Sequence, residues 1–463
     1  WCTVVPTAGG SAVRLDGALD GPPVRGPVGL TAVRSVEEAL TDSLAALAGL
    51  VDGGGGPGRY ADEPVLHART GRMLDPATPV IIGVGQIVRR DPDPDSATEP
   101  AAMSVEALRA AAADTGAGSD LLSRADLVYA VPSASWTYPD QAGFVAAAVG
   151  AEFAETVQTS PYGGDGAQLA VNDAAQRIAD RTAHLALVSG AEAGATVAAL
   201  QARGREPRWT TQDPDSGPDR VIGVDRPANN EAETSVGLGA PIYVYSLIES
   251  ALRADSGQSP EEHQQQIADL WSRHSAIAAD NPYAWDRTAR TPEEIGYPGP
   301  GNRTVSAPYT KFLCANLQVD LAAGVLVASV AAAQALGIDQ DKWVFLHAGA
   351  SGTDEWFVSE RADLTRSPAI AEAGAAALDH AGITADDLGP VDLYSCFPSA
   401  VQLGARALGL PWRDPARPLS VTGGLTSAGG PGNNYGLHAV SSLVPILRED
   451  PEQYGLSTSL GWY

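Results

Sequence analysis

The chain has 463 residues, 44% of them hydrophobic and 19% charged, which is enough apolar material for one or two domains and excludes disorder throughout. A net charge of −26 would repel a phosphate backbone, so nucleic acid is excluded as an expected partner. No apolar run reaches the ~20 residues that span a bilayer. The cysteines Cys2, Cys314 and Cys396 are too dispersed for a disulfide framework or a zinc site. We expect a cytoplasmic protein with no resident metal, no permanently bound cofactor and no membrane span.

Residues 1–72 begin at Trp1, are rich in Gly and Pro, and predict a largely irregular N-terminal extension. Within them, Ser35–Leu50 has a Ser cap, acidic residues in its first turn and apolar residues at helical spacing, which predicts one helix. The alternative is that the whole stretch precedes a natural start at Met73.

Regular structure is predicted after Met73. Pro79–Val84 is a continuous apolar run, as expected for a buried strand. Ser104–Asp114 predicts a helix capped by Ser104, and Asp126–Val131 predicts the next strand.

This succession of helix, glycine, acidic loop and apolar strand returns 266 residues later, from Glu106 to Glu372. The identical positions are Glu106, Ala107, Ala110, Ala111, Gly116, Leu122, Asp126 and Leu127, which match Glu372, Ala373, Ala376, Ala377, Gly382, Leu388, Asp392 and Leu393. The repeat predicts two similar halves, and chance matching of alanine-rich helices is the alternative.

Residues 195–305 separate the halves and predict an inserted region with amphipathic helices at Ala240–Ala254 and Ser259–Ala279. Because the chain has only two lysines, any phosphate-bearing ligand must be held by arginines or backbone N–H groups. The candidates in the inserted region are Arg203, Arg205 and Arg208, and a solvated charge cluster is the alternative.

Two glycine-rich segments, Ser160–Ala170 and Thr422–His438, precede predicted helices and would let a ligand reach free N–H groups, although tight turns alone also explain such glycines. Within the segment Val391–Phe397, Tyr394 and Cys396 lie at the C-terminal end of a buried strand predicted over Val391–Tyr394, the usual place of ligand chemistry in α/β sheets. A buried tyrosine and an inert thiol are the alternative. His347 and His438 are interpreted as core or surface histidines.

Several segments together, in this order, resemble the thiolase superfamily, closest to the sterol-carrier-protein-type thiolases and the mycobacterial thiolase-like proteins. They are 166–175 (GAQLAVNDAA), 183–193 (AHLALVSGAEA), 308–314 (PYTKFLC) and 422–440 (TGGLTSAGGPGNNYGLHAV). The resemblance implies an α/β thiolase fold in which two similar βαβαβαββ halves form a layered αβαβα arrangement with an inserted loop domain. The halves would be 73–320, containing 195–305, and 321–463.

The resemblance also assigns the site position by position. Gly163 stands where thiolases carry the nucleophilic cysteine, Gly430 where they carry the histidine that activates it, and Tyr394 where relatives keep a histidine of a His-Asp-Cys-Phe motif. Cys396 keeps the cysteine of that motif. The resemblance implies an oxyanion hole from the N–H groups of 163–166 and 429–432, and substrate contacts from Gly164, Gly429, Asn433 and Asn434.

These assignments predict an acyltransferase of acetyl-CoA acetyltransferase type, or a carbon–carbon lyase, that acts on acyl-CoA thioesters in lipid or steroid catabolism without the usual cysteine. Coenzyme A would be part of the substrate, and Tyr394 and Cys396 would supply acid–base catalysis. A non-catalytic acyl-CoA-binding or partner-scaffold protein is the alternative.

The family also implies a homodimer, paired through a sheet-edge strand near residues 157–160, and a small β-domain partner protein. The chain ends at Tyr463 after a strand predicted over Leu456–Trp462, where relatives continue into a last loop.

Overall fold

A computed structural model describes residues 2–7, 10–15, 60–90, 93–94 and 96–462. The chain divides into two compact units, Trp1–Gly56 and Pro57–Tyr463. In the first unit, β1 (Cys2–Thr7) pairs with β2 (Gly10–Leu15) as an antiparallel hairpin. The helix predicted at Ser35–Leu50 lies outside the described residues.

The composition predicted that the globular unit begins after residue 72. In the structure, the second unit also includes residues that precede this position. β3 (Val65–Leu66) pairs with β4 (Met73–Leu74), and Val65 is buried. Arg181, from the main body of the unit, forms ion pairs with Asp62 and Asp75. Residues 60–72 therefore pack as part of the globular unit.

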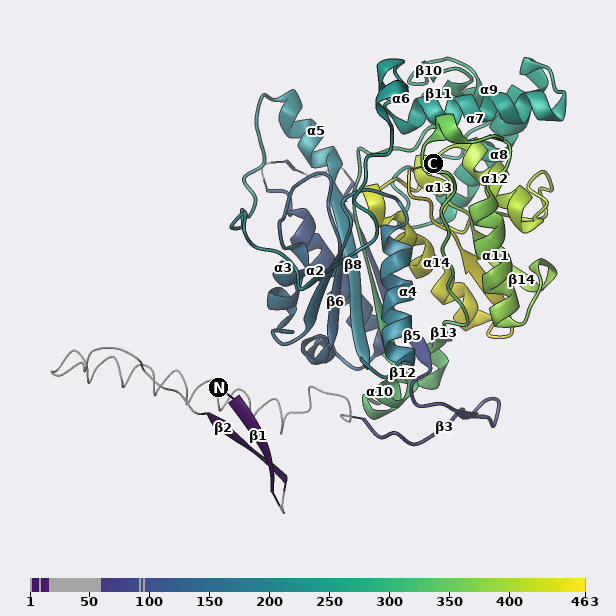
Figure 1. The fold of residues 1–463 in the computed structure, drawn as a ribbon. Helices are drawn as coiled ribbons and strands as arrows, with labels where there is room; N and C mark the ends of the chain where they lie inside the picture. Colours follow the sequence, from purple (N-terminus) through teal and green to yellow (C-terminus); the bar gives the residue numbers. More distant parts are fainter. Residues whose placement is uncertain (1, 8–9, 16–59, 91–92, 95, 463) are drawn as a thin grey trace. The chain divides into compact units, whose positions relative to one another are not determined.

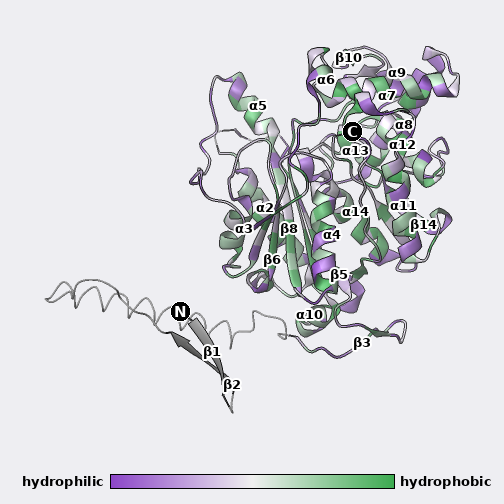
Figure 2. Ribbon diagram, in the orientation of Figure 1, coloured by the Kyte–Doolittle hydropathy of each residue, from purple (hydrophilic) through white to green (hydrophobic). Residues whose placement is uncertain are grey.

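A seven-stranded mixed sheet forms the centre of this unit. Its order is β13 (Val344–Phe345), β5 (Pro79–Val88), β12 (Asp320–Ser329), β8 (Leu185–Ala193), β6 (Leu127–Val131), β7 (Glu155–Thr159) and β9 (Arg220–Ile222). The strands from β8 to β9 are parallel, whereas β12 and β5 run antiparallel to their neighbours. Every residue of β8 and β12 is buried, which accounts for the apolar central strands in Figure 2.

Helices cover both faces of this sheet. α2 (Pro100–Thr115) and α3 (Gln141–Val149) lie on one face, and α4 (Gly166–Ala179) and α14 (Tyr435–Glu449) lie on the other (Figure 1). α14 also contacts a second, two-stranded parallel sheet. The next layer holds α11 (Pro368–Ala381) and α12 (Pro398–Leu408), which share an apolar cluster with that sheet. The predicted layered αβαβα arrangement is thus confirmed.

The two strands of the smaller sheet are β14 (Leu388–Asp392) and β15 (Tyr454–Ser457). The strand predicted over Val391–Tyr394 therefore ends at Asp392, and the one predicted over Leu456–Trp462 ends at Ser457. Another difference concerns α2, which begins at Pro100 and not at Ser104. Pro100 suits the first turn of a helix because its missing N–H would be unpaired there in any case, and Ser104 is buried inside the helix.

The two copies of the internal repeat have the same order of secondary-structure elements. α2 ends at Gly116 and α11 at Gly382, both with left-handed backbone (φ 79° and 70°). Each glycine is followed by a 3-10 helix, η1 (Ser119–Arg124) or η5 (Ala385–Asp387), and then by β6 or β14. The repeated glycine is explained by this conformation, which residues with a Cβ rarely adopt.

The strand expected to form a free sheet edge is covered in the structure. β7 pairs with β6 on one side and with β9 on the other, so the prediction of an edge at 157–160 is wrong. Arg220 of β9 holds this position through Glu155 (2.9 Å) and Asp173 (2.6 Å). The homodimer itself stays a prediction, now without that edge.

The inserted region contains both predicted amphipathic helices, α7 (Pro241–Ser256) and α8 (Pro260–Asp280), and Ser259 caps α8. Its other elements are α5 (Gly194–Ala202), β9, α6 (Glu231–Ser235), α9 (Pro292–Gly296) and β10 (Thr304–Ser306), which pairs with β11 (Tyr309–Thr310). The remaining helices are α10 (Val330–Ala335) and α13 (Gly424–Ser427). None of the helices in the described ranges is long and apolar enough to span a membrane.

A buried polar network ties the inserted region to α12. The carboxylate of Glu249 accepts hydrogen bonds from Gln402 (2.6 Å) and Tyr309 (2.7 Å) and lies 2.6 Å from Nε2 of His263. Tyr309 also contacts the hydroxyl of Ser399 (2.8 Å). Because each group depends on its partners in a dry environment, the network fixes the start of α12 against the inserted region.

Candidate functional site

A cavity of about 500 Å³ opens between α4, α11, α12 and the residues that follow β15. Its wall is mostly apolar and includes Ile370, Ala373, Ala377, Leu403, Leu408 and Leu456. At its polar end lie Gly163, Asp165 and Tyr394. A concave apolar site with a few converging polar groups is the usual form of a small-molecule site.

The loop before α4 has no room for a nucleophilic side chain. Gly163 has a φ of +110°, and a Cβ built on it would stand 2.3 Å from Oδ1 of Asp165. A cysteine would be strained and would collide with that carboxyl group. The carboxyl group of Asp165 therefore occupies the space into which a side chain at position 163 would project.

Tyr394 approaches the same loop from the second half. It lies two residues beyond the end of β14, and its hydroxyl stands 2.1 Å from where a Cβ on Gly164 would be. Burial raises the pKa of Tyr394, and the neighbouring acidic groups of Cys396 and Asp165 raise it further. The phenol therefore stays protonated near neutral pH and can donate a hydrogen bond.

Asp165 was not singled out by the sequence, and it completes this site. Burial raises the pKa of its carboxyl group above the ordinary value for Asp, and only its own backbone N–H opposes the shift. A carboxylate with a raised pKa beside a neutral phenol is an acid–base pair, and such shifts are common at functional sites. The available signal was the acidic residue at the third position of the Gly163-Gly164-Asp165-Gly166 run.

A buried network positions the loop that carries Tyr394. Asp392, at the end of β14, is fully buried and accepts hydrogen bonds from Tyr435 (2.8 Å) and Ser420 (2.9 Å). The ring of Tyr435 stands perpendicular to that of Tyr394, with centroids 5.5 Å apart. The backbone N–H of Tyr394 donates a hydrogen bond to the hydroxyl of Thr458 (2.9 Å). Contacts therefore hold both the backbone and the ring of Tyr394.

Cys396 is placed differently from Tyr394. It is buried, it lines neither of the two cavities described here, and its burial raises its pKa to about 12, although a hydrogen bond from Tyr245 acts in the opposite direction. Proton transfer by this thiol required a lowered pKa. The shift in the structure has the opposite sign, so Tyr394 and Asp165 are better candidates.

The two glycine loops differ in how many of their N–H groups are already bonded. Gly430 N–H donates to the carbonyl of Asn316 (2.9 Å) and Gly432 N–H to that of Gly430 (2.8 Å), which corrects the prediction that this loop offers an oxyanion hole through them. No hydrogen bond from the N–H groups of Gly163 and Gly164 is found among the described residues. These two groups remain available to an oxyanion.

Side chains of the second loop, which begins at Gly429, have a structural role. The Asn433 side chain donates to the carbonyl of Pro161 (2.9 Å), and that of Asn434 donates to Gly190 (2.7 Å). The first contact holds the second loop against the first, and the second ties the loop to β8. The structure thus brings the two predicted loops together.

The remaining candidates lie elsewhere. Arg203, Arg205 and Arg208 are exposed and line neither cavity, so their role in phosphate binding stays a prediction. His347 packs edge-on against Tyr454, and His438 is buried beside Gln86 with a pKa lowered by burial to about 3. Within the ranges that the structure describes, no group of three or more His, Cys, Asp or Glu side chains could hold a metal ion.

Comparisons with known proteins place this architecture. The SCP2-thiolase-like protein type 1 of Mycobacterium smegmatis, described as monomeric, is 31% identical to this chain over 84% of this chain and 76% of that one, with a TM-score of 0.70. An Ltp2–ChsH2(DUF35) aldolase (18% identity, 84% and 96% covered, TM-score 0.62) and human mitochondrial 3-ketoacyl-CoA thiolase (16%, 83% and 96%, 0.57) share the fold. No family model and no curated protein sequence matches. This chain belongs to the thiolase superfamily, among the SCP2-thiolase-like proteins.

Proposed function

We propose that this protein is a carbon–carbon lyase that cleaves a β-hydroxyacyl-CoA thioester by a retro-aldol reaction in lipid or steroid catabolism. One observation carries the proposal: the carboxyl group of Asp165 fills the space of a side chain at position 163, and the hydroxyl of Tyr394 meets the same loop. An acyl-enzyme requires an activated nucleophile, and this loop provides none. The geometry therefore supports a lyase better than acyl transfer of the acetyl-CoA acetyltransferase type.

The residues divide the reaction as follows. Asp165 takes the proton of the β-hydroxyl group, the Cα–Cβ bond breaks, and the electron pair moves into the thioester enolate. Tyr394 and the N–H groups of Gly163 and Gly164 donate hydrogen bonds to the enolate oxygen. The proton held by Asp165 is then delivered to Cα, which restores the carboxylate and releases a shortened acyl-CoA, while the β-carbon leaves as a ketone or aldehyde.

The size and lining of the cavity favour a substrate with a large acyl group. Its volume of about 500 Å³ and its mostly apolar wall suit a branched or ring-bearing chain better than an acetyl group. Coenzyme A enters this proposal as part of the substrate, not as a resident cofactor. The second neighbour, which shares this fold, is an aldolase, and this supports the proposal.

The test is a reaction of the full chain with a β-hydroxyacyl-CoA, followed by chromatography of the shortened acyl-CoA. Asp165→Asn should abolish the product, whereas the exposed Asp386→Asn should leave it unchanged. A parental rate in Asp165→Asn would refute the assigned base. Thiolysis of acetoacetyl-CoA without cleavage of the β-hydroxyacyl-CoA would show that the chain is an acyltransferase instead.

A non-catalytic acyl-CoA-binding or scaffold protein is the second candidate, and one contact favours it. The carbonyl of Leu460 lies 2.7 Å from the Cβ position on Gly164, and Gly461 lies close to Asp165, so residues 458–462 cover the loop. Tight acyl-CoA binding without turnover would support this candidate. Because one neighbour is a complex with a DUF35 protein, we also propose a small β-domain partner. Because another neighbour is monomeric, the proposed homodimer should be tested by sedimentation. A cytoplasmic location belongs to the same proposal.

A further inference from the structure

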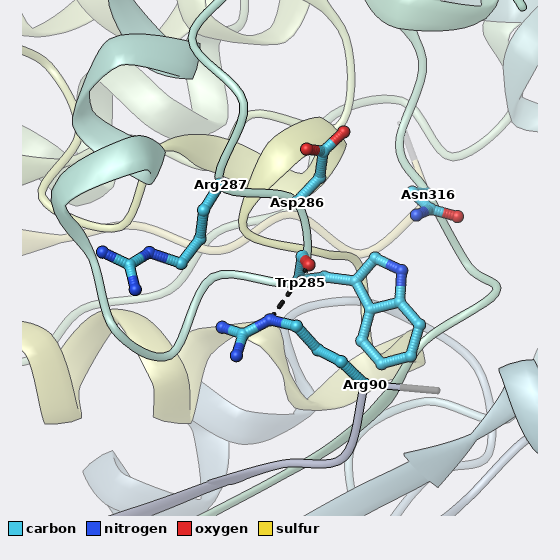
Figure 3. A pocket seen from close by; sticks show the side chains of 5 residues that line it. All are labelled: Arg90, Trp285, Asp286, Arg287 and Asn316. Atoms are coloured by element: carbon cyan, nitrogen blue, oxygen red, sulfur yellow. Dashed lines mark hydrogen bonds between the residues drawn. The ribbon is translucent and has the colours of Figure 1, made fainter. Parts of the chain in front are cut away.

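A second cavity, of about 370 Å³, lies outside the Tyr394 site. Its lining residues are Arg90, Trp285, Asp286, Arg287 and Asn316 (Figure 3), and the first cavity shares none of them. Arg90 follows β5, the residues from 285 to 287 follow α8, and Asn316 precedes β12. Three segments far apart in the sequence therefore meet here.

The charge of this cavity is positive in a strongly acidic protein. Its one acid, Asp286, is already neutralised by Arg290 (2.7 Å). Among the described residues, neither Arg90 nor Arg287 forms an ion pair with a carboxylate. With 30 Lys and Arg against 56 Asp and Glu in the whole chain, two uncompensated guanidinium groups at one cavity point to an anionic ligand.

Both guanidinium groups are held in place by neutral carbonyl groups. Arg90 donates to the carbonyls of Trp285 (3.2 Å) and Pro282 (2.8 Å), and Arg287 donates to Ala279 at the end of α8 (2.9 Å). These bonds use Nε and Nη2, and within the described ranges Nη1 of each arginine forms no hydrogen bond. Fixed guanidinium groups with spare donors lose little entropy when they bind a phosphate.

An aromatic surface completes the cavity. Figure 3 shows the guanidinium groups of Arg90 and Arg287 on one side and the indole of Trp285 beside Asn316 on the other. We infer that this cavity binds a phosphorylated nucleotide, with its phosphates on the two arginines and its base stacked on Trp285. Stacking on an aromatic side chain is a general way to hold a base.

The nucleotide can be free or can be the phosphoadenosine end of coenzyme A, and the second source rests on the proposed function. Backbone hydrogen bonds connect this cavity to the second glycine loop and to the loop that carries Tyr394. Asn316 accepts a hydrogen bond from Gly430 N–H (2.9 Å), and its neighbour Ala315 donates to the carbonyl of Cys396 (3.0 Å). One backbone segment thus separates the second cavity from the loops of the first site.

Calorimetry on the full chain tests the inference with adenosine 3′,5′-bisphosphate, ADP, coenzyme A and inorganic pyrophosphate as probes. Arg287→Ala should weaken binding of every probe about tenfold or more, because a charge-assisted hydrogen bond is lost. Trp285→Leu, which keeps an apolar contact beside Gly429, should weaken the nucleotides and leave pyrophosphate unchanged. Arg90→Lys serves as a milder second variant, since Arg90 also supports the loop. The exposed Arg366→Ala is the matched control and should bind like the parent.

Absence of binding by the parent at millimolar probe would overturn the inference, and so would binding that Arg287→Ala and Trp285→Leu leave intact. Tight binding of coenzyme A with weak binding of ADP identifies the coenzyme as the source, and equal binding identifies a free nucleotide. If the bisphosphate binds through Arg287 but no acyl-CoA is cleaved, the proposed function fails and the nucleotide site stands. If cleavage occurs with an unchanged KM in Arg287→Ala, coenzyme A is not the ligand of this cavity, and the calorimetry with the free nucleotides alone decides the inference.

Discussion

The two copies of the helix–glycine–strand module share their sequence pattern but differ in burial. α2 of the first copy packs most of its residues into the core, with Leu108 fully buried, whereas α11 of the second copy has no buried residue among those described. The counterpart of Leu108, 266 residues on, is Gly374, which lines the large cavity with Ala373 and Ala377. The same local pattern therefore supports a sheet in one half and borders a ligand cavity in the other.

The copies also diverge after the glycine that ends each helix. η5 is shorter than η1, so β14 begins at Leu388, ahead of Leu393, the counterpart of the first residue of β6. Tyr394 consequently lies in a loop, whereas its counterpart Val128 lies inside β6 and is fully buried. A small change in connection length thus places the side chain of Tyr394 at the cavity.

The largest expected effect is on Tyr394, where the copies differ most in role. Tyr394→Phe removes only the hydroxyl that would hold the enolate oxygen, and turnover of the β-hydroxyacyl-CoA should fall by about 10²- to 10⁴-fold. Thermal unfolding should stay close to that of the parent, because the ring and its contact with Tyr435 remain. Tyr162→Phe, on an exposed neighbour of the same cavity, is the control. Parental turnover in Tyr394→Phe would place the chemistry elsewhere.

The second prediction contrasts the two helices. Leu108→Ala should destabilise the protein by about 2–5 kcal/mol, since it leaves a void in a closed core. Ala377→Leu adds volume on the cavity side of α11 and should change the free energy of unfolding by less than about 1.5 kcal/mol while weakening binding of long acyl chains. Denaturant titration and acyl-CoA binding measure the two effects. Equal losses of stability would contradict the contrast in burial.

A third prediction concerns pH. Asp165 must be ionised to act as the base, and burial raises its pKa, so kcat/KM should fall as pH decreases through a value above the ordinary Asp pKa of about 3.9. Below that value the rate should drop about tenfold per pH unit, because the fraction of carboxylate drops by that factor. A pH profile that stays flat down to the acid unfolding transition would exclude Asp165 as the base.

Much of the layered fold follows from patterns that act locally. The apolar run at Pro79–Val84, the helices at Ala240–Ala254 and Ser259–Ala279, and the repeated glycines Gly116 and Gly382 each have a local physical cause. The free edge at 157–160 was not predictable in this way. β9 closes that edge from 61 or more positions along the chain, through the side chain of Arg220. Long-range pairing of a three-residue strand leaves no periodic signal in the sequence.

The candidate site could be predicted only in part, because some of its contacts also depend on segments that are far apart in the sequence. The position of Tyr394 after a strand and the glycine loop at 163–166 follow from local pattern and resemblance. The meeting of Asp165 with Gly163 depends on a φ of +110°, and the use of Gly430 N–H by Asn316 depends on a contact between distant segments. Neither backbone angles nor such contacts can be read from residue types alone.

The smallest expected effect is that of Cys396→Ala, which gives the second copy the residue of the first, Ala130. The thiol lines neither cavity, and its pKa is raised to about 12, so near neutral pH it is neither a nucleophile nor an effective base. Turnover should therefore stay near the parental rate, and loss of the buried sulfur should cost about 1 kcal/mol of stability. Steady-state kinetics with the β-hydroxyacyl-CoA and a urea titration give the two values. A loss of turnover as large as that of Tyr394→Phe would show that the thiol takes part in proton transfer, and would move the catalytic centre from the Asp165 side of Tyr394 to the Tyr245 side.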